Sequence, residues 1–207
     1  MSRIIAGAAG GTPLVSVPGS MTRPTTDRVK EALFSRLDAF GIIAGARVLD
    51  LYAGSGALGV ESSSRGADAV DLVEFDAKAS SVCQRNADLI NGVLARKAVT
   101  VHRSKVESFL ERAAEEARWD LVFLDPPYPL DEAAVAAVLA KLAGHLNPAA
   151  VVVVERSSRS PEPGWPAGLE RFADKKYGET RLWFAEPSVP DAITPDVVVD
   201  GKAAEEA

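Results

Sequence analysis

The sequence predicts an α/β fold built on a mostly parallel sheet with helices on both faces. From residue 47 onward, short apolar runs alternate with stretches of helical periodicity, which is the pattern of βαβ units. This rhythm changes near the end, where residues 169–177 and 180–186 form two expected strands with only Gly178 and Glu179 between them. A two-residue connection forces such a pair to run antiparallel. We therefore expect a parallel sheet that ends in an antiparallel pair.

The repeating part of the chain supplies five expected strands and four expected helices. The strands lie near residues 47–51, 69–74, 98–102, 120–124 and 150–155, and the helices near 57–65, 77–91, 105–116 and 131–143. The last helix begins at Leu130 and Asp131, and Gly144 suits its C-terminus.

Two further elements are expected before residue 47. Residues 3–6 and 14–17 are short β-like runs separated by glycines, which predicts a hairpin. A helix then starts near Asp27, because Asp suits the positive end of the helix dipole, and its apolar residues recur at helical spacing. We expect three parts: an N-terminal hairpin extension at 1–22, a main domain at 23–186 and an acidic tail at 187–207.

The composition is that of an ordinary soluble domain. The chain has 207 residues, of which 47% are hydrophobic and 25% charged. A single cysteine, Cys83, excludes an internal disulfide framework and a Cys-rich zinc site. His102 and His145 have no metal partners at useful spacing, so no metal is expected. Neither a secretory signal nor a membrane-spanning stretch is visible, and we expect a cytoplasmic protein.

Basic residues gather near the N-terminus although the net charge is −6. Four of them stand against the single acid Asp27 in residues 1–30, a net of +3: Arg3, Arg23, Arg28 and Lys30. A nucleic acid responds to such local patches rather than to total charge. Solvated surface charge is an equally good interpretation of this pattern taken alone.

A glycine-rich loop follows the first expected strand of the main sheet. Gly54, Gly56 and Gly59 fit G-x-G-x-x-G, a turn whose backbone lets a ligand approach beside a helix N-terminus. Asp50 would repel a pyrophosphate but suits an ammonium group. Glu74, which ends the second strand, can bond the hydroxyls of a ribose. The ligand with a ribose and an ammonium but no phosphate is S-adenosylmethionine (SAM). Taken singly, Asp50 as a capping or core residue and Glu74 as a surface acid remain open.

Four residues, Asp125-Pro126-Pro127-Tyr128, follow the strand at 120–124. The carboxyl edge of an open α/β sheet is where ligands bind. Hydrogen bonds to Asp125 and to a carbonyl such as that of Pro126 favour an amine whose lone pair attacks a methyl group. Tyr128 offers a face on which a base can stack, and the base must be single-stranded or flipped out. The two prolines fix the backbone. As an isolated tetrapeptide, the segment is also compatible with a simple turn.

The chain resembles the SAM-dependent amino-methyltransferases, and more narrowly the RsmD-type small-subunit (16S) rRNA guanine-N2 methyltransferases. The resemblance rests on five segments, residues 3–7, 22–34, 50–59, 73–76 and 125–128, and Tyr177-Gly178 before the final strand also fits. It implies a Rossmann-like fold with a seven-stranded sheet and one reversed strand. It also implies methylation of a guanine of 16S rRNA, in an assembling 30S particle, by a monomer.

The resemblance also implies roles for individual residues. The implied SAM-binding residues are Arg23, Thr25, Thr26, Asp50, Tyr52, Ala53, Gly54, Gly56, Glu74, Phe75, Ser104 and Lys105. The implied RNA-binding residues are Arg3, Arg23, Arg28 and Lys30, and the implied catalytic residues are Asp125, Pro126, Pro127 and Tyr128. Ser104 and Lys105 depart from the family, because many relatives have an acid there near the adenine amine.

Three alternatives remain at this point. The motif at 125–128 also serves methylases of adenine or cytosine amines in DNA or other RNA, and of protein glutamine. A non-catalytic rRNA-binding assembly factor could keep the same fold, although the intact Asp125 disfavours it. An NAD-linked oxidoreductase is disfavoured by Asp50 and by the absence of a plausible hydride-transfer acid.

Overall fold

The computed structural model describes residues 2–18, 27–127 and 130–188. Four residues with predicted roles lie outside these ranges, namely Arg23, Thr25, Thr26 and Tyr128. The same is true of nearly all of the predicted acidic tail.

Helices and strands alternate through the main domain as the sequence predicts. In chain order, the described elements are α1 (Asp27–Phe40), β1 (Arg47–Leu51), α2 (Ala57–Ser64), β2 (Ala69–Glu74), α3 (Ala77–Leu94), β3 (Val99–Arg103), α4 (Val106–Arg112), β4 (Trp119–Leu124), α5 (Glu132–Ala143), β5 (Leu146–Ser157), β6 (Leu169–Tyr177) and β7 (Thr180–Pro187).

All seven strands form one sheet in the order β3-β2-β1-β4-β5-β7-β6. The five strands β1 to β5 run parallel to one another. Strand β7 runs antiparallel to both β5 and β6, so it is the one reversed strand of the sheet. The predicted Rossmann-like α/β fold, with its seven strands and its reversed strand, is confirmed. The strand order changes direction between β1 and β4, which places a topological switch point there.

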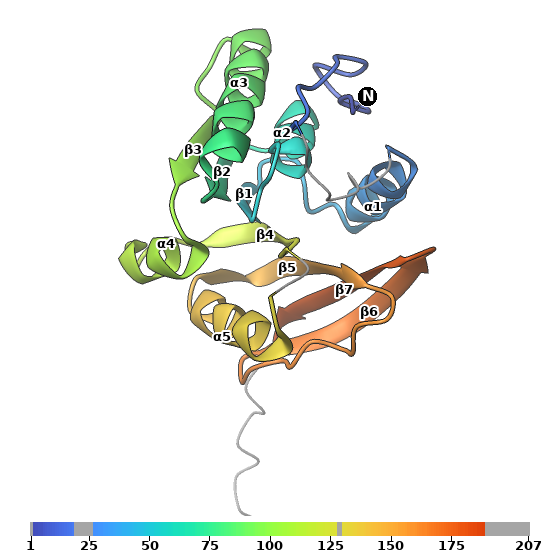
Figure 1. The fold of residues 1–207 in the computed structure, drawn as a ribbon, viewed down its shortest axis with the longest axis vertical. Coiled ribbons are helices and arrows are strands. Elements are labelled where there is room, and N and C mark those ends of the chain that lie inside the picture. Colours follow the sequence, from blue (N-terminus) through green and yellow to red (C-terminus); the bar gives the residue numbers. More distant parts are fainter. Residues whose placement is uncertain (1, 19–26, 128–129, 189–207) are drawn as a thin grey trace, which may run out of the picture.

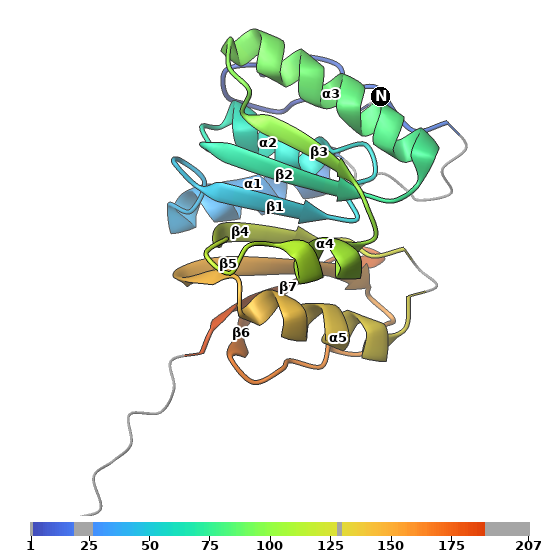
Figure 2. The same cartoon turned by 90° about the vertical axis from the view of Figure 1, so that its left-hand side faces the viewer.

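Helices cover both faces of the sheet (Figures 1 and 2). On one face, α1, α2 and α3 bury residues such as Phe34, Val60 and Ile90 against the strands. On the other face, α4 and α5 do so with residues such as Leu110 and Leu139. The central strands β1 and β4 are therefore buried on both faces, which explains why they read as continuous apolar runs in the sequence.

Side-chain caps mark the starts of two helices. Helix α3 follows Asp76, whose carboxylate accepts hydrogen bonds from the backbone of Lys78 (3.0 Å) and Ala79 (2.9 Å). Helix α5 follows Asp131, which accepts one from Ala134 (2.8 Å). Such caps satisfy N–H groups that a helix leaves unpaired. The two caps therefore fix where α3 and α5 begin.

Two element boundaries differ from the predicted ones. Strand β5 begins at Leu146 rather than near residue 150, and its register to β4 shifts between Trp119 and Leu121. The sequence does not predict this early start, because Pro148 is unfavourable in a central strand. In the structure, the irregular register accommodates the proline. Helix α4 ends at Arg112 rather than near residue 116. Two acids at 115–116 would oppose the negative end of the helix dipole.

The predicted N-terminal β-hairpin is largely wrong. The chain does turn back on itself, but the described residues pair in one antiparallel bridge, Arg3 with Pro13, and not in two strands over 3–6 and 14–17. Backbone bonds join Ile4 to Thr12 (2.9 Å) and Leu14 to Ser2 (2.9 Å). A longer ladder cannot form because side chains of α2 take the intervening backbone amides, as described below. We call residues 2–18 the N-terminal segment.

Candidate active site

A pocket of about 950 Å³ lies along the carboxyl edge of the parallel strands. It is lined by residues that follow four strands: the glycine loop after β1, Phe75 after β2, Ser104 and Lys105 after β3, and Asp125 with its prolines after β4. Ser2 and residues 16–18 of the N-terminal segment contribute a further part of its wall, as do Tyr177, Glu179 and Thr180. The structure therefore brings the two predicted motifs into one cavity.

The glycine loop shows why glycine is needed at two of its positions. Gly54 has φ 57°, and a Cβ atom built on it would point into open space with no neighbour within 4 Å. A ligand can thus approach this backbone closely. At Gly59 a Cβ atom would lie 2.3 Å from Leu72 Cδ2, so this glycine lets α2 pack on β2. Gly54 thus leaves space beside the backbone, whereas Gly59 serves the fold.

Asp50 is buried at the base of the pocket. Its Oδ2 accepts a hydrogen bond from the backbone N–H of Gly59 (3.0 Å). Burial raises the pKa of this carboxyl to about 7, helped by the nearby Glu74, although the bond from Gly59 opposes the rise. The ionised form is therefore costly until a cation comes near. An ammonium group in the pocket would supply that cation, as the sequence predicts.

Glu74 shapes the glycine loop directly. Its two carboxylate oxygens accept the backbone N–H groups of Gly54 (2.8 Å) and Asp76 (2.7 Å). The sequence interpretation gave Glu74 only a ligand role, and these two bonds are an additional function. A carboxylate offers about four acceptor sites, so two remain for the hydroxyls of a ribose. Ala53 holds the same loop from its other side through its backbone bond to Val73 (3.0 Å).

Tyr52 has an unusual backbone, with φ 61° at the end of β1. Its ring packs against the apolar core beneath α4 while it also lines the pocket. Burial, followed by the charge of Glu107, raises the pKa of its hydroxyl to about 12. The tyrosine therefore stays protonated at neutral pH and acts as an apolar floor beneath the loop.

An exposed aromatic ring marks the β2–β3 end of the pocket. Phe75 is 60% exposed, and Lys105 Nζ lies 5.5 Å from the centre of its ring. The Ser104 hydroxyl donates to the Lys105 carbonyl (3.0 Å) and accepts from Arg112 (2.8 Å). A large exposed ring beside a cavity is a natural platform for a flat heterocycle. Phe75 therefore offers such a platform at this end of the pocket, with Ser104 and Lys105 beside it.

Asp125 opens onto the same pocket one residue beyond β4. The surrounding protein raises the pKa of this carboxyl well above its ordinary value, the carboxylates of Glu155 and Asp50 add to the rise, and Arg156 opposes it. Because the Asp125 side chain is exposed to the pocket, water relieves part of its desolvation, and the neighbouring acids carry more weight. An amine that donates hydrogen bonds would be held at this position.

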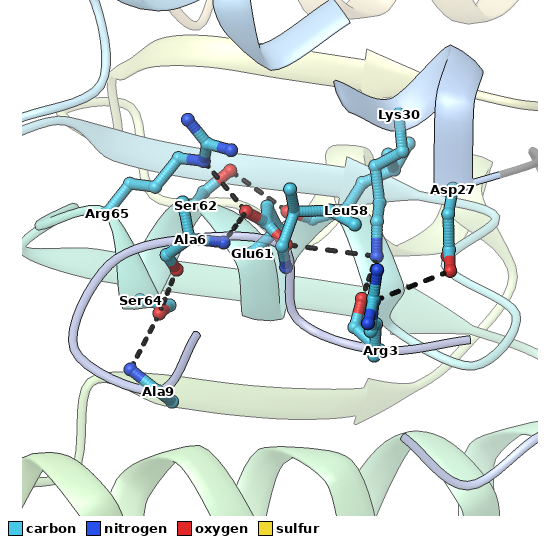
Figure 3. Close-up of polar contacts among 12 residues, drawn as sticks. Arg3, Ala6, Ala9, Asp27, Lys30, Leu58, Glu61, Ser62, Ser64 and Arg65 are labelled. Carbon is cyan, nitrogen blue, oxygen red and sulfur yellow. Dashed lines mark hydrogen bonds and ion pairs between the residues drawn. The ribbon is translucent and has the colours of Figure 1, made fainter. Parts of the chain in front are cut away.

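Lys30, a predicted RNA-binding residue, is buried instead (Figure 3). Its amine donates to the Arg3 carbonyl and lies 3.8 Å from the Glu61 carboxylate. The amphipathic helix α1 turns this lysine inward, so its side chain cannot reach a phosphate. Arg3 and Arg28 are exposed, and Arg3 forms a long ion pair with Asp27 (4.0 Å).

Glu61 and Ser64 hold the N-terminal segment on α2 (Figure 3). The Glu61 carboxylate accepts the backbone N–H groups of Ile5 (2.6 Å) and Ala6 (3.0 Å). The Ser64 hydroxyl donates to the Ala6 carbonyl (2.6 Å) and accepts from the Ala9 amide (3.0 Å). These bonds replace the ladder of the expected hairpin. Sequence reasoning missed both residues, because neither stands near the N-terminal segment in the chain.

Asn86 on α3 links the N-terminal segment to the glycine loop. Its side chain accepts from the backbone N–H of Val15 (2.9 Å) and donates to the carbonyls of Val15 (3.0 Å) and Ser55 (2.8 Å). It is completely buried. One amide thus joins two walls of the pocket, and no local sequence signal marks it.

The described residues hold no group of three or more His, Cys, Asp or Glu side chains that could bind a metal ion. Among the described helices, none has both the length and the apolar character that crossing a bilayer requires.

Comparison with known proteins shows to which family this chain belongs. Residues 2–186 match the model of a protein family described as Conserved hypothetical protein 95. The chain belongs to this family. It is 35% identical to the ribosomal RNA small subunit methyltransferase D of Haemophilus influenzae, over 77% of this chain and 80% of that protein. For the protein of the same name from Escherichia coli K12, the identity is 34% over 86% and 85%.

A solved structure agrees with these relatives. The putative methyltransferase yhhF from Escherichia coli superposes with a TM-score of 0.75 at 31% identity, covering 91% of this chain and 98% of that one. As a member of the Conserved hypothetical protein 95 family, the chain is a SAM-dependent methyltransferase. Its pocket fits SAM, since the open face of Gly54, the buried Asp50 and the exposed Phe75 ring meet the needs of a sulfonium ligand with ammonium, ribose and adenine groups.

Proposed function

We propose that the protein methylates the exocyclic 2-amino group of one guanine in small-subunit (16S) rRNA. The observation that carries this proposal is that Asp125 and its prolines open onto the same pocket as the glycine loop. Acceptor and methyl donor can therefore meet in one cavity. The printed names of the relatives, ribosomal RNA small subunit methyltransferase D, support ribosomal RNA as the acceptor.

Asp125 has two tasks in this reaction. SAM, when bound, supplies an electrophilic methyl group. Asp125 accepts a hydrogen bond from the amine, which orients the nitrogen lone pair and favours the positive charge that grows there. As the new N–C bond forms and the S–C bond of the donor breaks, the amine must lose one proton. The raised pKa of Asp125 makes it a better proton acceptor than an ordinary carboxylate.

The other pocket residues hold the donor. Asp50 binds the ammonium group, Glu74 the ribose hydroxyls, and Phe75 with Ser104 and Lys105 the adenine ring. Because Gly54 leaves its backbone open, the donor can lie against the loop. The residues outside the described ranges keep the roles that the sequence suggests: Tyr128 stacks on the acceptor base, and Arg23, Thr25 and Thr26 close over the methionine end.

The RNA lies across the N-terminal segment and α1. Arg3 and Arg28 are exposed there, and the same segment forms part of the pocket wall. A target base must leave its stack to enter such a pocket. We propose that the substrate is a 30S particle in assembly and that the enzyme acts as a monomer in the cytoplasm.

The test is methyl transfer from labelled SAM to 30S subunits taken from cells that lack this protein, followed by mass spectrometry of the rRNA nucleosides. N2-methylguanosine at one position is expected with the wild-type enzyme. Asp125→Asn should lose at least about a hundredfold in kcat while SAM affinity, measured by calorimetry, is kept. Methyladenosine, or label in protein, would contradict the proposal. So would full turnover by Asp125→Asn.

A further inference from the structure

A second carboxylate stands beside Asp125 at the acceptor end of the pocket. Strands β4 and β5 are parallel neighbours, and Leu124 pairs with Val154. The next residue on each strand is an acid, Asp125 on one and Glu155 on the other. Both line the pocket. Adjacent strands lie about 4.8 Å apart, so the two positions are separated by roughly the width of a base edge.

The side chains of these two acids share one face of the sheet. Leu124 and Val154 both point into the apolar core beneath α4 and α5. Successive residues of a strand point to opposite faces, so Asp125 and Glu155 both turn toward the face covered by α1 and α2. The influence of Glu155 on the pKa of Asp125 agrees with this placement, because it requires the two carboxylates to be close.

Arg156 is a buried cation that also lines this pocket. Arg156 follows Glu155 and therefore lies on the opposite face, where its guanidinium donates to the Leu130 carbonyl (3.0 Å) and to Glu132 (2.5 Å). Arg156 lowers the pKa of Asp125, but this effect is the smallest of those that act on that carboxyl. A carboxylate offers about four acceptor sites, so Asp125 and Glu155 can each accept a hydrogen bond from a base in the pocket in addition to their contacts within the protein.

Guanine matches this pair of acceptors better than the other bases do. Its N1–H and its 2-amino group are donors on neighbouring atoms, whereas the ring nitrogen beside the amine of adenine or cytosine is an acceptor. We propose that Glu155 accepts the N1–H of guanine while Asp125 accepts from the 2-amino group, so that Glu155 selects guanine as the methylated base. This role rests on the proposed function. In adenine or cytosine, the ring nitrogen would place one hydrogen-bond acceptor opposite another, the Glu155 carboxylate. A binding site strongly rejects a base that makes such a mismatch.

The test uses rRNA in which the methylated guanosine, once mapped, is replaced by 2-aminopurine. This analogue keeps the 2-amino group, but its N1 is an acceptor. The wild-type enzyme should prefer guanine by at least about a hundredfold in kcat/KM. A glutamine amide can turn its carbonyl toward the N1–H of guanine or its NH₂ toward the N1 acceptor of 2-aminopurine. Glu155→Gln should therefore accept both bases, gain activity on 2-aminopurine and shrink the preference to less than about tenfold. Glu170→Gln, at an exposed acid of β6 outside the pocket, should keep the wild-type preference.

The outcomes separate the role of Glu155 from the function itself. An unchanged preference in Glu155→Gln, with guanine still methylated, overturns the role of Glu155 and leaves the proposed function standing. Equal use of guanine and 2-aminopurine by the wild-type enzyme overturns it without any variant, so the test survives a variant that fails to fold. Absence of methyl transfer to rRNA by the wild-type enzyme overturns both.

Discussion

Lys30 and Glu61 form an ion pair in the interior, with 3.8 Å between the lysine Nζ and the carboxylate. Their side chains are 2% and 0% exposed. The pair fixes the N-terminal segment, since Glu61 also accepts the Ile5 and Ala6 amides and Lys30 donates to the Arg3 carbonyl. A wall of the methyltransferase pocket therefore depends on charges that the solvent does not reach.

Removal of the lysine charge should destabilise the fold strongly. Lys30→Met leaves Glu61 with less compensation in the interior, and breaking a buried pair costs about 3–5 kcal/mol. Arg65, which bonds Glu61 at 2.8 Å, limits the loss to the lower part of that range. Urea unfolding followed by circular dichroism measures the change. Lys97→Met, at an exposed lysine, is the control and should stay within about 0.5 kcal/mol. A Lys30→Met protein as stable as wild type would refute this account.

Asn86→Ala should weaken SAM binding as well as stability. The substitution leaves the Ser55 carbonyl and both backbone groups of Val15 without their side-chain partner. Each buried group left unsatisfied costs about 1–3 kcal/mol. Because Ser55 belongs to the glycine loop, calorimetry should show a higher Kd for SAM. Gln84→Ala, which removes an exposed bond on the same helix, should change neither quantity. Normal SAM affinity in Asn86→Ala would show that the link does not serve the loop.

SAM affinity should rise with pH through about 7. The pKa of Asp50 is raised to about 7 in the folded protein, against about 3.9 in an unfolded chain. Below pH 7 the carboxyl is neutral and binds an ammonium group poorly; above it, the carboxylate is available. In the ligand-free protein the sign for stability is opposite, because a folded state that binds the extra proton loses stability as pH rises from about 4 to 7. Calorimetry at pH 5.5 to 8.5 checks the affinity, and Asp50→Asn should abolish this dependence.

The strand and helix pattern of this protein could be predicted because it is local. Strand β1 occupies the predicted residues 47–51, since an apolar run flanked by a glycine loop specifies its own limits. The burial of Lys30 could not be predicted from the sequence, because it depends on Glu61, which lies 31 residues away in the chain. Glu155 was missed for a similar reason. In the sequence it only ends an apolar run, and its meaning comes from the register with β4.

Arg3 and Arg28 should set part of the salt dependence of rRNA binding. Both are exposed, and neutralising one phosphate of a single strand contributes a slope of about −0.7 in log K against log salt. Replacement of both by Ala should therefore make the slope less steep by about 1.4, measured by filter binding between 50 and 200 mM salt. The matched control replaces Arg47 and Lys97, which are exposed at or just before the amino ends of β1 and β3, and should leave the slope unchanged. If the Arg3 and Arg28 variant keeps the wild-type slope, the RNA does not cross the N-terminal segment.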